Sequence, residues 1–311
     1  MRTGSKVKLA LLRFFASLVA CTGFSGVTVL GNAMGRIIWK LVPERRELAI
    51  ASIMKHLGKD RTEAERIAFE SFRHNGRSFL EIVLTHKFGL DSPRLRFDPP
   101  ELFEELKNCQ RPIVAATAHF GSWELLASLL GQVYEDPRPR MVVVRRYPDK
   151  AVQTFIAERR QATGATMVGH RRAAMDVVRA LHKHGIVAFL VDHNTKTNEA
   201  AFLPFLGEEA AVNMGPALLA VRGKALVWPV VLERDGSDYV FRLQKPLDTA
   251  ELTGTREENI HETARFYTEA VETFIQHAPE QWFWMHERWK TKAKKTEAGA
   301  KPAPLSDEDD D

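Results

Sequence analysis

A histidine and a glutamate stand five residues apart at the junction of a predicted strand and a predicted helix. Residues 113–118 form a short apolar run, and His119 follows it directly. A helical pattern then covers residues 122–132, with Ser122 as the expected N-cap and Glu124 in the first turn. Across such a loop we expect the Glu124 carboxylate to reach one imidazole nitrogen of His119, which leaves the other nitrogen free to accept a proton. A histidine packed at the end of a strand, with no catalytic role, has the same pattern.

Other kinds of chemistry find less support in the sequence. Ser122 is not part of a G-x-S-x-G motif, and the chain contains no H-E-x-x-H, Walker A or G-x-G-x-x-G motif. The spacing of His182, His184, Asp192 and His193 matches no common metal site. We therefore predict a site that works without a metal and without a bound cofactor.

The charge pattern points to an anionic partner or to a solvated basic surface. The net charge is only +4, because the last five residues of the chain are all acidic and offset part of the basic charge elsewhere. Residues 138–184 contain eleven Lys or Arg against three Asp or Glu. No zinc-finger or RNP pattern accompanies these cations, so nucleic acid is not expected as the partner. Anionic lipid headgroups or an acidic protein remain candidates.

The elements that position these residues alternate along the chain. Short apolar strands are predicted over residues 113–118, 141–144, 186–191, 225–232 and 239–243, and helices over 122–132, 149–163, 171–184, 215–222 and 257–277. Two further helices, over 44–57 and 62–87, precede them. This order predicts an α/β fold in which a mixed sheet is flanked by helices.

The N-terminal segment is predicted to meet a membrane. Residues 14–35 carry no charge, and as one helix they would be about 33 Å long. Because basic residues flank both ends, a single weak span and a helix dipping into one leaflet both fit, and a buried core helix is the alternative. Gly31 and Gly35 form a G-x-x-x-G motif, which suits close packing within the chain as well as dimerisation.

Three segments are therefore expected. Residues 1–42 form an N-terminal anchor, residues 43–290 form the catalytic domain, and residues 291–311 form a disordered charged tail with almost no apolar side chains. The two cysteines, Cys21 and Cys109, are predicted to be unpaired and to indicate a reducing compartment.

Several sequence blocks resemble one enzyme family. The segment His119–Glu124 resembles the H-x-x-x-x-[DE] block of the glycerolipid acyltransferases, and later blocks narrow the resemblance to the lipid A biosynthesis (lauroyl or myristoyl) acyltransferases. The blocks keep their order over about residues 10–290. They are residues 142–146, 184–192, 202–207, 215–220, 227–230 and 278–290.

This resemblance implies a glycerolipid-acyltransferase-like fold and a role for each conserved position. The enzyme would transfer a fatty acyl chain from an acyl carrier protein or coenzyme A thioester to a hydroxyl of a lipid A precursor, at the cytoplasmic face of a bacterial inner membrane. His119 would be the general base and Glu124 its orienting partner. The expected contributors to substrate or oxyanion binding are Arg145, with Arg146 as the alternative, Asp192 and Gly207.

Two other functions stay open. The same blocks would serve an acyltransferase for another membrane glycolipid or phospholipid, such as a phosphatidylinositol mannoside. A catalytically inactive lipid-binding protein of the same fold is the non-enzyme alternative. The segment Phe202–Gly207 and the side chains of Trp282, Trp284 and Trp289 offer apolar surface for acyl chains, and ordinary core packing would use them equally well.

Overall fold

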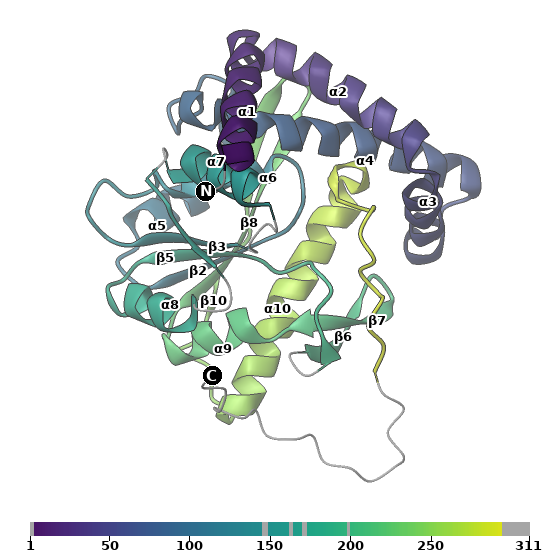
Figure 1. Cartoon of the computed structure of the whole chain (residues 1–311). Coiled ribbons are helices and arrows are strands. Elements are labelled where there is room, and N and C mark those ends of the chain that lie inside the picture. The colour runs from purple at the N-terminus through teal and green to yellow at the C-terminus, as the bar shows by residue number, and fades with distance from the viewer. Residues whose placement is uncertain (1–2, 145–148, 162–163, 170–172, 198–199, 294–311) are drawn as a thin grey trace.

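The computed structural model describes residues 3–144, 149–161, 164–169, 173–197 and 200–293, which form one central sheet covered by helices (Figure 1). The helices are α1 (Thr3–Cys21), α2 (Gly23–Leu41), α3 (Pro43–Leu57), α4 (Arg61–Glu81), α5 (Pro100–Asn108), α6 (Trp123–Leu130), α7 (Lys150–Gln161), α8 (Ala173–His182), α9 (Gly215–Arg222) and α10 (Arg256–His277), with the 3₁₀ turns η1 (Ile82–Lys87) and η4 (Pro279–Gln281). The strands are β1 (Leu95–Asp98), β2 (Ile113–Thr117), β3 (Arg140–Val144), β4 (Thr166–Gly169), β5 (Ile186–Leu190), β6 (Ala200–Phe205), β7 (Glu208–Asn213), β8 (Leu226–Asp235), β9 (Asp238–Leu243) and β10 (Leu247–Asp248).

The main sheet is mixed, with a parallel centre. Its strand order is β1-β9-β8-β2-β5-β3-β4, and β10 pairs with β8. Strands β8, β2, β5, β3 and β4 are mutually parallel, whereas β9 and β10 run antiparallel to β8. Strands β6 and β7 form a separate hairpin. The predicted mixed sheet flanked by helices is thus confirmed.

Both faces of this sheet are buried, which explains why its central strands are continuous apolar runs. Along β2, Val114 and Ala116 point to the side covered by α8, α9 and α10. Ile113 and Ala115 point to the opposite side, where they meet α5 and α6. Because side chains alternate along a strand, each central strand contributes to two apolar layers, and the strand ends are held between these layers.

The N-terminal apolar segment is not the continuous helix that residues 14–35 predict. It breaks between α1 and α2, where Gly23 has a φ of +66° that suits glycine, and the two helix axes differ in direction by 117°. Within the described part of the chain, neither helix alone has the length and apolarity to cross a bilayer. Among the helices that the structure describes, only the bent pair reaches that length and composition together.

The G-x-x-x-G motif of α2 packs within the chain. Helix α2 lies along α4 (Figure 1), and Gly31 and Gly35 face Gly76. A Cβ on Gly76 would stand 2.2 Å from the carbonyl oxygen of Gly31, and one on Gly35 would stand 2.3 Å from the carbonyl oxygen of Phe72. The two helices therefore touch through their backbones, and α2 is fixed to the helix that also supports the candidate site.

Replacing Gly76 by alanine should weaken this helix pair. The added methyl group has no free space, and overpacking of this kind costs about 1–3 kcal/mol. We expect the Tm of the Gly76→Ala protein to fall by several degrees in a thermal melt. Gly4→Ala is the matched control, because a Cβ at Gly4 meets nothing within 4 Å and its Tm should not fall. Equal melting temperatures for both variants would contradict the close α2–α4 contact.

Candidate active site

His119 and Asp192 meet at the carboxyl edge of two neighbouring parallel strands. Strands β2 and β5 pair in register, with Thr117 opposite Leu190. His119 and Asp192 each stand two residues beyond those strand ends, so both side chains emerge at the same edge. This edge is where open α/β sheets usually bind ligands.

The Asp192 carboxylate is the centre of the site. It is completely buried and accepts three N–H donors. Its Oδ1 accepts from Nδ1 of His119 at 2.9 Å, and its Oδ2 accepts from the backbone N–H of His119 and from Nε1 of Trp282, each at 2.9 Å. The end of β5, the loop after β2 and the C-terminal segment are thereby joined at one group.

This arrangement fixes the tautomer of His119. An ionised carboxylate can only accept hydrogen bonds, so Nδ1 carries the proton and Nε2 has the free lone pair. The His119 side chain is 30% exposed, in contrast to the buried carboxylate behind it. The imidazole therefore presents a proton acceptor toward the outside of the fold, as a general base requires.

Charge around the imidazole favours its protonated form. Burial by itself lowers the pKa of His119, but the Asp192 carboxylate outweighs burial, and Glu124 adds to it, so the pKa is raised above the ordinary histidine value. The same pair acts in reverse on the acid: burial raises the pKa of Asp192, while His119 outweighs it and holds that pKa well below the usual range. Asp192 therefore stays ionised when His119 takes up a proton.

Glu124 does not orient His119, contrary to the expectation from the five-residue spacing. Its two carboxylate oxygens accept from Nε and Nη2 of Arg160 at 2.8 and 2.5 Å, and both side chains are about nine-tenths buried. The physical reason is the packing of α7, which brings Arg160 to the first turn of α6 and gives the buried carboxylate a bidentate partner. Glu124 lies near enough to act on His119 through its charge, but the hydrogen bond to Nδ1 belongs to Asp192.

Aromatic side chains form the wall beside the imidazole. The ring centres of Trp123 and Phe283 lie 5.5 and 6.0 Å from that of His119. Phe79 packs edge-on against both rings and is itself 47% exposed. An apolar surface thus runs from the outside of the molecule to the proton acceptor, which suits a hydrocarbon chain next to the reacting group.

The other predicted site residues do not all meet at this edge. Arg145 and its alternative Arg146 lie outside the described residues. Gly207 lies in the two-residue turn between β6 and β7, where its φ of +79° meets the needs of a tight hairpin. The described contacts of this turn are made by Leu206 with His56 and Glu272, not with His119 or Asp192.

Two smaller expectations also change. Ser122 is the N-cap residue of α6 but makes no capping bond with its side chain, and its buried Oγ has no hydrogen-bond partner among the described residues. Trp282 and Trp284 are 1% exposed, so they belong to the core and not to a lipid-facing surface. Histidine, cysteine and acidic side chains in the described ranges nowhere gather as three or more potential metal ligands.

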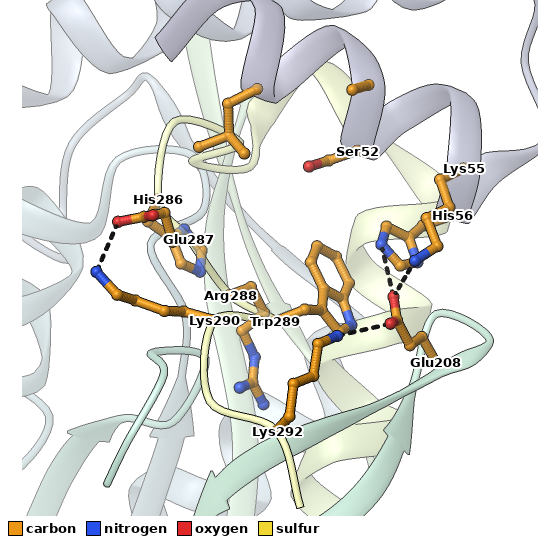
Figure 2. A pocket seen from close by; sticks show the side chains of 12 residues that line it. Ser52, Lys55, His56, Glu208, His286, Glu287, Arg288, Trp289, Lys290 and Lys292 are labelled. Carbon is orange, nitrogen blue, oxygen red and sulfur yellow. Dashed lines mark hydrogen bonds and ion pairs between the residues drawn. The ribbon is translucent and has the colours of Figure 1, made fainter. Parts of the chain in front are cut away.

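A pocket of about 270 Å³ lies between α3, the start of β7 and residues 286–292 (Figure 2). Glu208 stands at its rim, bound by Lys55 and Lys292 at 2.7 Å each, and these contacts lower its pKa to about 2. His56 stacks on Trp289 with ring centres 3.6 Å apart. These contacts connect residues 289–292 with α3. They hold the C-terminal segment, which also carries Trp282, against the rest of the fold.

Comparison with known proteins identifies the family of such a chain. The model for the family described as "Bacterial lipid A biosynthesis acyltransferase" matches residues 5–291. The lipid A biosynthesis palmitoleoyltransferase of Escherichia coli is 26% identical over 272 residues, which cover 85% of this chain and 84% of that protein. The lipid A biosynthesis lauroyltransferase of the same organism is 26% identical over 276 residues, 85% of each chain. A lipid A biosynthesis acyltransferase of Shigella flexneri is similar to the same degree.

Asp192→Asn should change both the height and the pH dependence of the reaction rate. Loss of the charge removes the main influence that raises the pKa of His119 and leaves burial, which lowers it. As a general base His119 would act in its neutral form, so the rate should fall as the pH drops through its pKa, and this acid limb should move to lower pH in the variant. The plateau should fall about 10²–10⁴-fold, because the tautomer is no longer held.

The measurement is kcat/KM against pH for the two proteins. Asp176→Asn serves as the control, since Asp176 forms an exposed pair with Arg179 and should alter neither feature. An unchanged limb and plateau in Asp192→Asn would rule out Asp192 as the partner that sets the proton affinity of His119.

Proposed function

Because the chain belongs to the bacterial lipid A biosynthesis acyltransferase family and is therefore an acyltransferase, we propose that it moves a fatty acyl chain from a carrier thioester to a hydroxyl of a lipid A precursor. The observation that carries this proposal is the His119–Asp192 pair, whose imidazole turns an unprotonated Nε2 outward beside an aromatic wall. A lipid hydroxyl needs a base of this kind, and an acyl chain needs such a wall.

The reaction follows from these positions. The acceptor hydroxyl donates its proton to Nε2 of His119 as its oxygen attacks the thioester carbonyl carbon. Asp192 stabilises the imidazolium ion that forms, through the bond to Nδ1. When the tetrahedral intermediate collapses, the C–S bond breaks and the imidazolium returns the proton to the departing thiolate. The products are a lipid ester and a free carrier thiol.

Negative charge on the tetrahedral oxygen needs donors nearby. The first amides of α6, beginning with that of Trp123, start four residues after His119 and have no carbonyl partner one turn earlier in the helix. The Ser122 hydroxyl, buried without a described partner at this helix start, is a further donor. Arg145 is proposed as a binding residue for the phosphate groups of the acceptor or for the oxyanion.

The basic window over residues 138–184 offers less free charge than its composition implies. Among the described residues of this window, three cations form ion pairs within the fold, as Arg138 binds Asp136, Arg160 binds Glu124 and Arg179 binds Asp176. We propose that the remaining cations of the window speed the encounter with an acidic donor, acyl carrier protein, or hold acceptor phosphates. Acyl coenzyme A is the alternative donor.

The N-terminal helices are proposed to rest on one leaflet of the bacterial inner membrane, at its cytoplasmic face. One face of α1 packs on α7 through Leu9 and Ala16, while the opposite face exposes large apolar side chains. Exposed on α1 are Val7, Leu11, Phe14, Phe15 and Leu18, and exposed on α2 are Val29, Leu30, Ile37 and Leu41. Amphipathic helices of this kind bind at the lipid–water interface.

Purified protein should transfer acyl chains to a lipid A precursor in detergent micelles, measured by mass spectrometry of the lipid. Acyl carrier protein and coenzyme A thioesters are supplied in parallel, so that the donor is determined in the same assay. His119→Ala should lower the rate about 10²–10⁴-fold and keep the wild-type Tm. A folded His119→Ala protein with near-normal transfer would overturn the mechanism, and no ester with either donor would overturn the function.

Charges placed on the outer face of α1 should release the protein from lipid. The double variant Phe14→Asp and Leu18→Asp puts carboxylates where we expect acyl chains, and binding to anionic vesicles should fall at least tenfold in co-sedimentation. Transfer to a detergent-dispersed acceptor should stay unchanged, because neither residue contacts the site. Arg256→Glu, an exposed change on α10 that alters the net charge by the same −2, is the control. Undiminished vesicle binding by the double variant would rule out this face as the anchor.

A further inference from the structure

The chain turns sharply between His119 and α6, and this turn is held by its backbone. Gly121 has a φ of +55°, and a Cβ there would stand 2.0 Å from the carbonyl oxygen of Leu232. The N–H of the next residue, Ser122, donates to that same oxygen at 2.8 Å. The turn therefore lies directly on strand β8, with no room for sliding.

Both peptide groups of Gly121 are engaged. Its N–H donates to the carbonyl oxygen of Gln281 at 3.0 Å, and its carbonyl oxygen accepts from Oγ of Ser78 at 2.6 Å. The Ser78 hydroxyl has a second acceptor within reach, the carbonyl oxygen of His74 at 3.1 Å on its own helix. The Ser78 hydroxyl therefore has two carbonyl acceptors within reach, and only that of Gly121 belongs to the turn.

Arg234 holds the Ser78 hydroxyl in place. Its Nη2 donates to Oγ of Ser78 at 2.7 Å, which occupies a lone pair and leaves the hydroxyl proton for a carbonyl acceptor. The backbone of Arg234 also exchanges two bonds with the side chain of Gln281, each 2.9 Å long. Both partners of Gly121 are thus connected to this one residue of β8.

Glu81 holds Arg234 in turn. Its carboxylate accepts from Nε at 3.0 Å and from Nη2 at 2.5 Å, and the hydroxyl of Tyr239 donates to it at 3.1 Å. The two charged side chains are 3% and 2% exposed. A buried ion pair of this kind often adds little stability compared with apolar side chains of equal volume, so its presence under the turn calls for another reason.

We infer that Glu81 and Arg234 are positioning residues for the acyl transfer proposed above. Through Ser78 they set the place of Gly121, and so the position of the His119 imidazole relative to the first amides of α6. Neither residue touches the reacting atoms. Their contribution is geometric: the proton acceptor and the oxyanion donors stand on the two sides of one turn, and a shift of about 1 Å between them costs about a hundredfold in rate.

The test replaces the ion pair by apolar side chains of similar volume. The triple variant Glu81→Leu, Arg234→Met and Tyr239→Phe removes both charges and the hydroxyl that would lose its acceptor. We expect kcat to fall ten- to a hundredfold, with the donor KM within twofold of wild type, the acid limb unmoved because Asp192 is intact, and the Tm within a few degrees. The single variant Arg234→Lys should also have a lower kcat than wild type, because lysine lacks the planar fork that reaches Glu81 and Ser78 together.

A second variant keeps the test decisive if the triple variant folds poorly. Ser78→Ala leaves the bonds between Glu81 and Arg234 in place and removes the hydroxyl that connects Arg234 to Gly121. We expect kcat to fall about fivefold, the rate equivalent of one ordinary hydrogen bond. The matched control is Arg111→Met with Asp248→Leu, a bidentate pair at the opposite end of the sheet, which should keep the wild-type kcat.

The outcomes separate this inference from the proposed function on which it rests. Wild type and His119→Ala are measured in the same assay and decide the function by themselves. If they differ as expected while Ser78→Ala, or a well-folded triple variant, retains the wild-type kcat, the positioning role is overturned and the function stands. A fall in kcat with unchanged KM and Tm supports the role.

Discussion

Everything at the candidate site depends on one buried carboxylate that accepts three N–H groups. Asp192 is fully covered, so its negative charge would be costly without the imidazole, amide and indole donors that surround it. Two donors come from His119, after β2, and the third comes from Trp282 in the C-terminal segment, which means that the charge can be satisfied only when β2, β5 and that segment have all assembled. The tautomer of His119 is therefore a consequence of the complete fold. The C-terminal segment that carries Trp282 is also connected to α3, because Lys292 and Lys55 both bind Glu208.

The sequence predicted those parts of the fold in which a local pattern and the tertiary environment agree. Strands β2, β5 and β8 are apolar runs because both sheet faces are covered, and the sequence placed them within one to three residues. The sequence predicts no strand over the β6–β7 hairpin, where Pro204 and Gly207 weaken the strand pattern. The predicted partner of His119 was wrong for a related reason: spacing along the chain says nothing of the pairing of β2 with β5. The sequence did contain a sign of the correct partner, because His119 and Asp192 each follow a predicted apolar strand. The carboxyl ends of adjacent parallel strands lie at the same edge of a sheet.

At the N-terminus the local sequence pattern and the tertiary environment disagree. An uncharged stretch of 22 residues predicts one long helix, yet Gly23 allows the turn that divides it, and each half then packs on a different element. Helix α1 lies on α7, with Lys8 paired to Asp149 and Arg13 to Glu158, while α2 lies on α4 through Gly31 and Gly35. The helices with the most exposed apolar surface thus pack on the two helices that contribute Arg160 and Ser78. In the proposed function, the lipid-facing surface and the reactive imidazole are parts of one rigid assembly.

The two carboxylates near His119 divide the electrostatic work. Glu124 is already neutralised by Arg160, and their effects on the imidazole oppose each other, since Glu124 raises the pKa of His119 and Arg160 lowers it. Asp192 has only neutral N–H partners until His119 gains a proton, and at that moment its charge becomes part of an ion pair. At a pH above the pKa of His119, this ion pair forms in the proposed mechanism only when the acceptor hydroxyl gives up its proton. The stabilisation therefore appears as the reaction proceeds and is absent in the resting protein, which is the condition for an electrostatic contribution to rate rather than to binding.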